Sequence, residues 1–144
     1  MAAGDITFFN AGLEEALENW AGSDTIKIAI LDNTATPSAA TATPALGDFT
    51  EVGTAGTYTA GGTSLGTWTN FVTFSGGTTT FDSATNPTWA QHASNDVDAY
   101  WGLIYNDTQV GDPALAYVDL GGPVDMSAGS LTITWNASGI ATIS

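Results

Sequence analysis

The sequence predicts a mainly β fold: a single-domain antiparallel β-sandwich or jelly roll over residues 1–144, with one N-terminal α-helix. The first observation is composition, because the chain holds 23 Thr, 17 Gly, five Trp, six Phe and four Tyr. Threonine and aromatic residues favour strands, and glycine favours turns. The second observation is spacing: roughly six or seven short apolar segments are separated by turn signals. The third is length, since 144 residues suit one domain.

The helix is expected over about residues 10–21. Asn10 is a plausible N-cap residue, and Gly22 is expected to end the helix. We expect one apolar face of this helix to dock on a sheet. That face is formed by residues at the spacing i, i+3, i+4 and i+7: Leu13, Ala16, Leu17 and Trp20.

A strand is expected next, over residues 25–31, where Ile26, Ile28 and Ile30 alternate with Lys27 and Ala29. The isoleucines are expected to point inward. Residues 33–47 then turn into Ala, Thr and Pro with few large apolar side chains. We expect a loop or an extended arm there, because such a segment cannot bury enough apolar surface to fold by itself.

The remainder of the chain, from Tyr58 onward, has the pattern of an all-β segment. Gly76 and Gly77 predict a hairpin, and Gly121-Gly122-Pro123 is expected to end a strand. The nearly continuous apolar run at residues 99–105 is typical of a central strand covered on both faces. The expected strands cover residues 68–74, 78–81, 99–105, 114–120, 131–135 and 140–143.

Charge excludes several classes of partner. The chain has 15 acidic side chains, a single Lys (Lys27), no Arg and a formal net charge of −14. Nucleic-acid binding and attachment to anionic membranes both require clustered basic residues, so neither is expected. We also expect no secretory leader and no membrane span, because no basic N-terminal region and no apolar run of about 20 residues occurs.

Catalysis is not expected either, and no cofactor is implied. The chain has no cysteine, which removes disulfides, thiolate chemistry and cysteine-based metal sites. His92 is the only imidazole; it lies in a polar stretch, and no Gly-x-Ser-x-Gly motif accompanies it. Paired carboxylates could serve a glycosidase, but most of the acidic residues fall in turns or outward strand positions.

Two Asp/Asn groups leave calcium open as an alternative. Calcium takes six to eight oxygen ligands, which Asp-rich loops can supply, yet neither group has the spacing of an EF-hand. Asp and Asn are also common turn formers. The groups are Asn95, Asp96 and Asp98, and Asn106, Asp107 and Asp112.

The tryptophans and the N-terminal apolar residues are the candidates for an interface. Trp101 and Trp135 are expected in the core, whereas Trp68 and Trp89 lie near turns and could be core lids, interface anchors or sugar platforms. The apolar segment before the helix could form an edge strand or dock on a neighbouring subunit. The candidate interface residues are Ile6, Phe8, Phe9, Trp68 and Trp89.

Several motifs are spread along nearly the whole chain: residues 24–31 after the helix, EVGTAGTYTAGG at 51–62, LIYNDT at 103–108 and LTITWNASGI at 131–140. In these motifs and their order, the chain resembles a family of small virion structural proteins of tailed bacteriophages. The resemblance implies a head decoration (cement) protein on the outer capsid surface. Its partner would be the major capsid protein, and such proteins often form trimers.

The expected function is therefore non-enzymatic stabilisation of contacts between capsid subunits. Subunits of so acidic a protein are expected to meet through surfaces of low charge, rich in Thr, Gly and aromatic residues. The alternative function is a carbohydrate- or receptor-binding module of a phage tail or fibre, with exposed Trp side chains as sugar platforms. A cellular acidic β domain is a third possibility.

Overall fold

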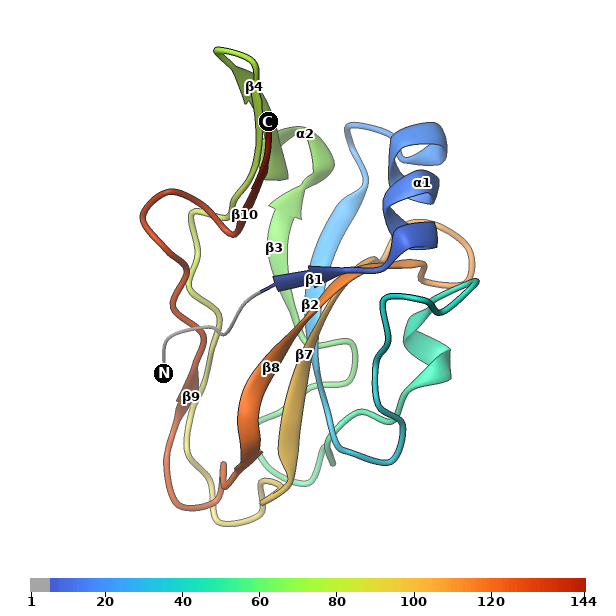
Figure 1. The fold of residues 1–144 in the computed structure, drawn as a ribbon. Helices are drawn as coiled ribbons and strands as arrows, with labels where there is room; N and C mark the ends of the chain where they lie inside the picture. The colour runs from blue at the N-terminus through green and yellow to red at the C-terminus, as the bar shows by residue number, and fades with distance from the viewer. Residues whose placement is uncertain (1–5) are drawn as a thin grey trace.

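The computed structural model describes residues 6–144, and its centre is a five-stranded antiparallel sheet (Figure 1). The strand order in this sheet is β1-β8-β7-β2-β3. A three-stranded sheet, β10-β5-β4, and a two-stranded sheet, β6-β9, complete the strands. The strands are β1 (Ile6–Phe8), β2 (Thr25–Leu31), β3 (Thr63–Thr67), β4 (Val72–Ser75), β5 (Thr78–Phe81), β6 (Thr88–Trp89), β7 (Ala99–Asn106), β8 (Ala114–Val124), β9 (Leu131–Thr132) and β10 (Ala141–Ile143).

Helices contribute little to this fold, which confirms the predicted mainly β class with one substantial N-terminal helix. The helices are α1 (Asn10–Asn19), the single turn α2 (Trp68–Phe71) and a short 3₁₀ helix (Leu46–Asp48). None of the helices in residues 6–144 is long and apolar enough to cross a membrane.

Both faces of the central sheet are covered, as β2 illustrates. Ile26, Ile28 and Ile30 belong to the larger core cluster, whereas Ala29 and Leu31 belong to a second cluster on the opposite face. The alternation of side chains along a strand places these two sets on opposite faces. The expectation of inward isoleucines is confirmed, but Ala29 is equally buried because the sheet has a layer on each side.

Different segments cover the two faces. The larger core cluster receives Phe71 from α2, Phe81 from the three-stranded sheet, and Leu131 and Trp135 from the C-terminal part of the chain. The second face is covered by the segment that the sequence predicted as a loop or arm over residues 33–47. This segment has no helix or strand before Leu46, and Leu46 packs against the second cluster.

Helix α1 begins and ends differently from the prediction. Its N-cap is Phe9, without a side-chain cap hydrogen bond, so Asn10 is not the cap. The helix ends at Asn19 with Trp20 as its C-cap, before Gly22. Leu17 is 74% exposed, because the helix docks through Gly12 and Ala16 instead.

The docking of α1 depends on a glycine. A Cβ atom at Gly12 would lie 2.0 Å from the carbonyl oxygen of Ala114 in β8. Any larger side chain would therefore push the helix away from the sheet. The expected apolar face of the helix is therefore confirmed only in part, since Leu17 contributes nothing to this contact.

Three predicted strands also need correction. Residues 68–74 were expected to form one strand, but Trp68–Phe71 forms a helical turn and only Val72 onward is a strand. Strand β8 does not end at residues 121–123 but continues to Val124. Within this stretch Gly121 and Gly122 have positive φ values of 85° and 107°. Such glycines are typical of strand irregularities, not only of strand ends. At the expected strand 131–135, side chains alternate in burial, but only Leu131–Thr132 is paired as a strand.

Candidate functional site

The three-stranded sheet of β4, β5 and β10 extends past the rest of the molecule and is the most prominent surface feature (Figure 1). We call it the projecting sheet. A two-residue turn, Gly76-Gly77, joins β4 to β5, and both glycines have positive φ values of 59° and 84°. Positive φ at both positions is the requirement of the turn that best matches strand twist, so these glycines are needed here.

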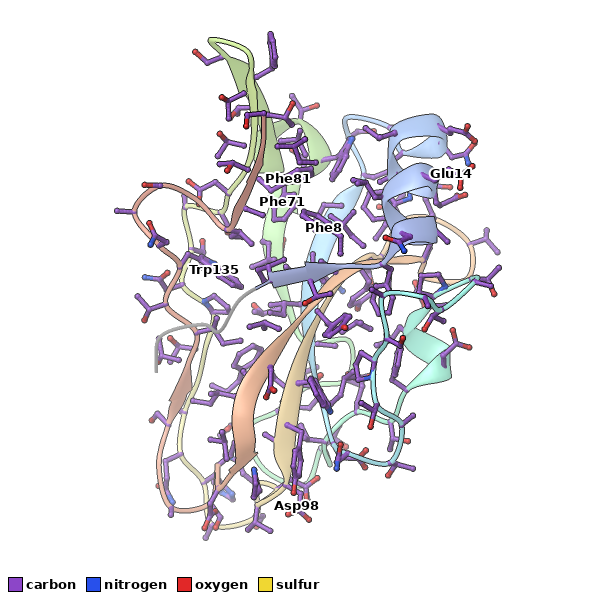
Figure 2. The ribbon with its side chains drawn as sticks, in the orientation of Figure 1. Phe8, Glu14, Phe71, Phe81, Asp98 and Trp135 are labelled. Carbon is purple, nitrogen blue, oxygen red and sulfur yellow. The ribbon has the colours of Figure 1, made fainter. Side chains whose placement is uncertain are left out.

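The projecting sheet contains no charged side chain in a chain with a net charge of −14. Residues 52–95 and 126–144 together contain one carboxylate side chain, Asp82. The remaining carboxylates lie in residues 1–51 and 96–125, together with Lys27. We call the described part of these two segments, residues 6–51 and 96–125, the acidic body. Figure 2 shows two of its carboxylates, Glu14 on the outer side of α1 and Asp98 at the end of the molecule opposite the projecting sheet.

An aromatic cluster anchors the projecting sheet to the rest of the fold. Phe81 of β5 lies with its ring centre 5.0 Å from that of Phe8, and 6.1 Å and 6.2 Å from those of Phe71 and Trp68. Trp68 also makes an edge-on contact with Trp20, at 5.0 Å. Figure 2 shows Phe8, Phe71 and Phe81 together at the base of the sheet. Tilted aromatic pairs at these distances are stabilising beyond the area that they bury.

The five candidate interface residues fall in different environments. Phe9 is fully buried and Trp89 is 5% exposed, so neither contributes to the surface of the folded chain. Ile6 lies on β1, an edge strand that pairs with β8. The apolar segment before the helix therefore joins the sheet of its own chain. Phe8 and Trp68 are half-buried in the aromatic cluster. Burial of Trp89 removes one of the two side chains proposed as sugar platforms.

Sequence reasoning missed the two most exposed apolar side chains of the projecting sheet, Phe74 (73% exposed) and Ile143 (43% exposed). A signal for them was present, because no charged residue occurs between Glu51 and Asp82 or after Asp125. Such uncharged runs in an acidic chain indicate where the molecule can make close contacts without burying charge.

The first Asp/Asn group that the sequence left open for calcium fastens loops to one another. The amide of Asn95, which is buried, accepts from the backbone N–H of Thr57 at 2.7 Å and donates to the carbonyl oxygens of Ala90 and Met126. Asp96 accepts from the backbone N–H of Gly53. These side chains satisfy backbone groups of four residues, of which Gly53 and Thr57 belong to one segment.

The second group has the same structural role. Buried Asn106 donates to the carboxylate of Asp24 at 2.8 Å, and Asp107 forms an ion pair with Lys27 at 2.8 Å. Hydrogen bonds from Gln109 and Asn106 hold the pKa of Asp24 below its usual value, while burial and the neighbouring Asp107 raise the pKa of Asp112. In residues 6–144 no group of three or more His, Asp or Glu side chains is arranged to hold a metal ion.

A hydrogen-bond network also holds the segment 51–62, which is one of the motifs in the sequence. Glu51 accepts from the Tyr58 hydroxyl at 2.5 Å and from the backbone N–H of Gly61 at 2.7 Å. Tyr105 donates to the carbonyl oxygen of Gly61 at 2.7 Å. Burial, with the bond to Glu51, raises the pKa of Tyr58, so the hydroxyl keeps its proton as a structural donor.

The chain was also compared with known proteins. No family model, no curated protein and no solved structure matches it.

Proposed function

We propose that this protein is a non-enzymatic head decoration protein of a tailed bacteriophage. In this proposal it binds the outer surface of the capsid and adds contacts between subunits of the major capsid protein. It associates with copies of itself, as a trimer, and acts without a cofactor. The observation that carries the proposal is the separation between the acidic body and the uncharged projecting sheet.

This separation supports adhesion because charged groups are costly to bury at an interface and uncharged groups are not. Three copies, each at −14, can approach one another only where their carboxylates are absent. A strongly acidic body also has no affinity for the packaged genome. Since many copies act together on one particle, modest affinity at each site is enough.

The single histidine and several buried polar side chains have structural partners. His92 is exposed in a loop, where its ring Nδ1 accepts from the backbone N–H of Ser94 at 3.1 Å. The carboxylate of Asp24 and the amides of Asn95 and Asn106 accept or donate hydrogen bonds that hold loops in place. These contacts support a role based on shape and adhesion.

The test is a count of copies per particle in virions assembled from the genome that carries this chain. We expect hundreds of copies per head, and we expect heads stripped of the protein to release DNA at lower temperature while adsorption to cells is unchanged. A handful of copies, with loss of adsorption on removal, would favour the receptor-binding alternative. Absence from the particle would contradict both.

A further inference from the structure

The peptide bond between Asp112 and Pro113, in the turn from β7 to β8, has an unusual backbone. Asp112 is the one residue other than glycine with a positive φ, 50°, among residues 6–144. A residue that precedes proline normally has an extended backbone with φ near about −120°, because the proline ring crowds its N–H and Cβ. The surrounding structure therefore holds Asp112 in a strained conformation. The sequence contains no other Asp-Pro dipeptide.

Backbone hydrogen bonds fix this peptide bond on both sides. The N–H of Asp112 donates to the carbonyl oxygen of Gln109 at 3.1 Å. The carbonyl oxygen of Pro113 accepts from the N–H of Asn106 at 3.0 Å. The carbonyl oxygen of Asp112 itself accepts from the N–H of Leu46, also at 3.0 Å. This last hydrogen bond polarises the carbonyl group and is placed to stabilise negative charge that develops on its oxygen.

The carboxyl group of Asp112 lies in surroundings that favour its protonated form. Burial, followed by the negative charges of Asp107 and Glu51, raises its pKa against the opposing charge of Lys27. A carboxyl group with a raised pKa keeps its proton at a higher pH than an ordinary aspartate does. The other ionisable groups on the elements around this turn are Tyr105 of β7, Asp48 of the 3₁₀ helix and Glu15 of α1.

Water has access to this peptide bond. Asp112 and Pro113 are half-buried, and the turn that contains them lies beside the start of α1 (Figure 1). A hollow of about 200 Å³ is lined by Gly111 and Pro113, which flank Asp112, together with α1 and residues 42–45. Hydrolysis at this bond therefore has its co-reactant at hand.

We propose that the Asp112–Pro113 bond is a self-cleavage site that the fold activates in mildly acidic solution. A side-chain oxygen of protonated Asp112 attacks the carbonyl carbon of the same residue and forms a cyclic anhydride. The bond from this carbon to the nitrogen of Pro113 breaks, and the carboxyl proton moves to that nitrogen. Water then opens the anhydride, so the net reaction is hydrolysis of one peptide bond. Proline is a favourable leaving group, because its tertiary amide nitrogen is more basic than the nitrogen of other peptide bonds.

The fold adds two contributions to the ordinary acid lability of an Asp-Pro bond. Cleavage ends the restriction that Pro113 imposes on Asp112, so strain that is present before the reaction is relieved. The N–H of Leu46 stabilises the carbonyl oxygen when the attack places negative charge on it. The two fragments should stay together after cleavage, because β8 begins beyond the break and pairs with β1 and β7. This reaction belongs to the chain itself and does not depend on the proposed function.

The test is intact-mass spectrometry of the purified full chain, denatured after incubation at pH values between about 4 and 6. Near-ultraviolet circular dichroism identifies the most acidic buffer in which the chain stays folded, and rates are compared there. We expect fragments 1–112 and 113–144, whose masses sum to that of the intact chain plus a water molecule. Cleavage should be at least about tenfold faster in the folded chain than in the chain unfolded by urea at the same pH. The rate should fall as pH rises through the raised pKa of Asp112, because the reaction consumes the carboxyl proton.

Two variants separate this reaction from other causes of cleavage. Asp112→Asn tolerates a positive φ but lacks the acidic proton, so the bond should stay intact under the same conditions. Pro113→Ala keeps the acid but removes both the restriction on Asp112 and the more basic nitrogen, so cleavage should be slower. The inference is overturned if the folded wild type is not cleaved, or if it is cleaved no faster than the unfolded chain. Cleavage of either variant at the wild-type rate would overturn it as well.

Discussion

Aromatic contacts occur both in the acidic body and at the base of the projecting sheet, but the body also uses polar side chains to fasten its loops. In the body and the loops that adjoin it, carboxylates and amides such as Asp24, Asn95 and Asn106 fasten loops through hydrogen bonds. At the base of the projecting sheet, aromatic rings such as Phe8 and Phe81 make the contacts. The difference teaches that polar side chains of the body make contacts inside the molecule, while the projecting sheet leaves the uncharged side chains Phe74 and Ile143 exposed.

The largest effect is expected from two phenylalanines on the same face of the projecting sheet. Phe81→Ala should lower the free energy of unfolding by about 3–5 kcal/mol, because it empties the centre of the aromatic cluster. Phe74 lies on the neighbouring strand β4, two residues from the position that pairs with Phe81. Phe74→Ala should change the free energy of unfolding by less than about 0.5 kcal/mol. Denaturant unfolding of dilute protein measures both. Equal losses would show that Phe74 is already covered within one chain.

The next effect concerns the loop fastener Asn95. Asn95→Ala should cost about 3 kcal/mol of unfolding free energy, since it leaves the N–H of Thr57 and the carbonyl group of Met126 without their partner and removes one of two donors to the carbonyl group of Ala90. Asn136→Ala, in an exposed turn, is the control and should cost under about 1 kcal/mol. The cost at Asn95 should be the same with calcium and with a chelator. Stability that rises with calcium in the wild type alone would instead indicate an ion site there.

A smaller effect is expected from the pH dependence of Asp24. Its hydrogen bonds hold its pKa in the folded chain below the unfolded value of about 3.9, so the ionised carboxylate stabilises the fold above that pH. This stabilisation is lost as pH falls through the lowered pKa. Asp24→Asn should therefore be less stable than wild type by about 1–2 kcal/mol at pH 7. The gap should narrow in acid, and a gap that widens in acid would contradict the assignment.

The smallest effect is that of salt on self-association. Carboxylates on the acidic bodies repel, and the screening length falls from about 10 Å at 0.1 M to about 3 Å at 1 M ionic strength. Raising the salt concentration should therefore strengthen association by a few-fold in the ultracentrifuge. Association that weakens with salt would indicate ion pairs in the interface, and would place the contact on the acidic body.

Strand content and several strand positions could be predicted from sequence because period-two patterns are local. The strand at residues 25–31 and the hairpin at Gly76-Gly77 are confirmed. Residues 68–74 were misassigned because Trp68 and Phe71, three residues apart, fit a helical turn as well as an apolar strand. Gly121 and Gly122 looked like a strand end, but their positive φ values let β8 continue to Val124.

The candidate surface could be predicted only in part. The expectation that subunits meet through uncharged, Thr-rich surfaces is a statement about composition, and it stays a prediction. Which residues form such a surface depends on the pairing of β10 with β5, and these strands are far apart in the sequence. Register across the three strands, not the pattern of any one of them, places Phe74 and Ile143 in one row.

The most direct test compares amide hydrogen exchange of the self-associated protein with that of the same chain when dilute. If the uncharged projecting sheet is the adhesive part of the molecule, exchange should slow at residues 72–81 and 141–143 on assembly and stay unchanged at residues 96–125. Protection that falls on residues 96–125, with the projecting sheet exchanging as fast as before, would contradict the account.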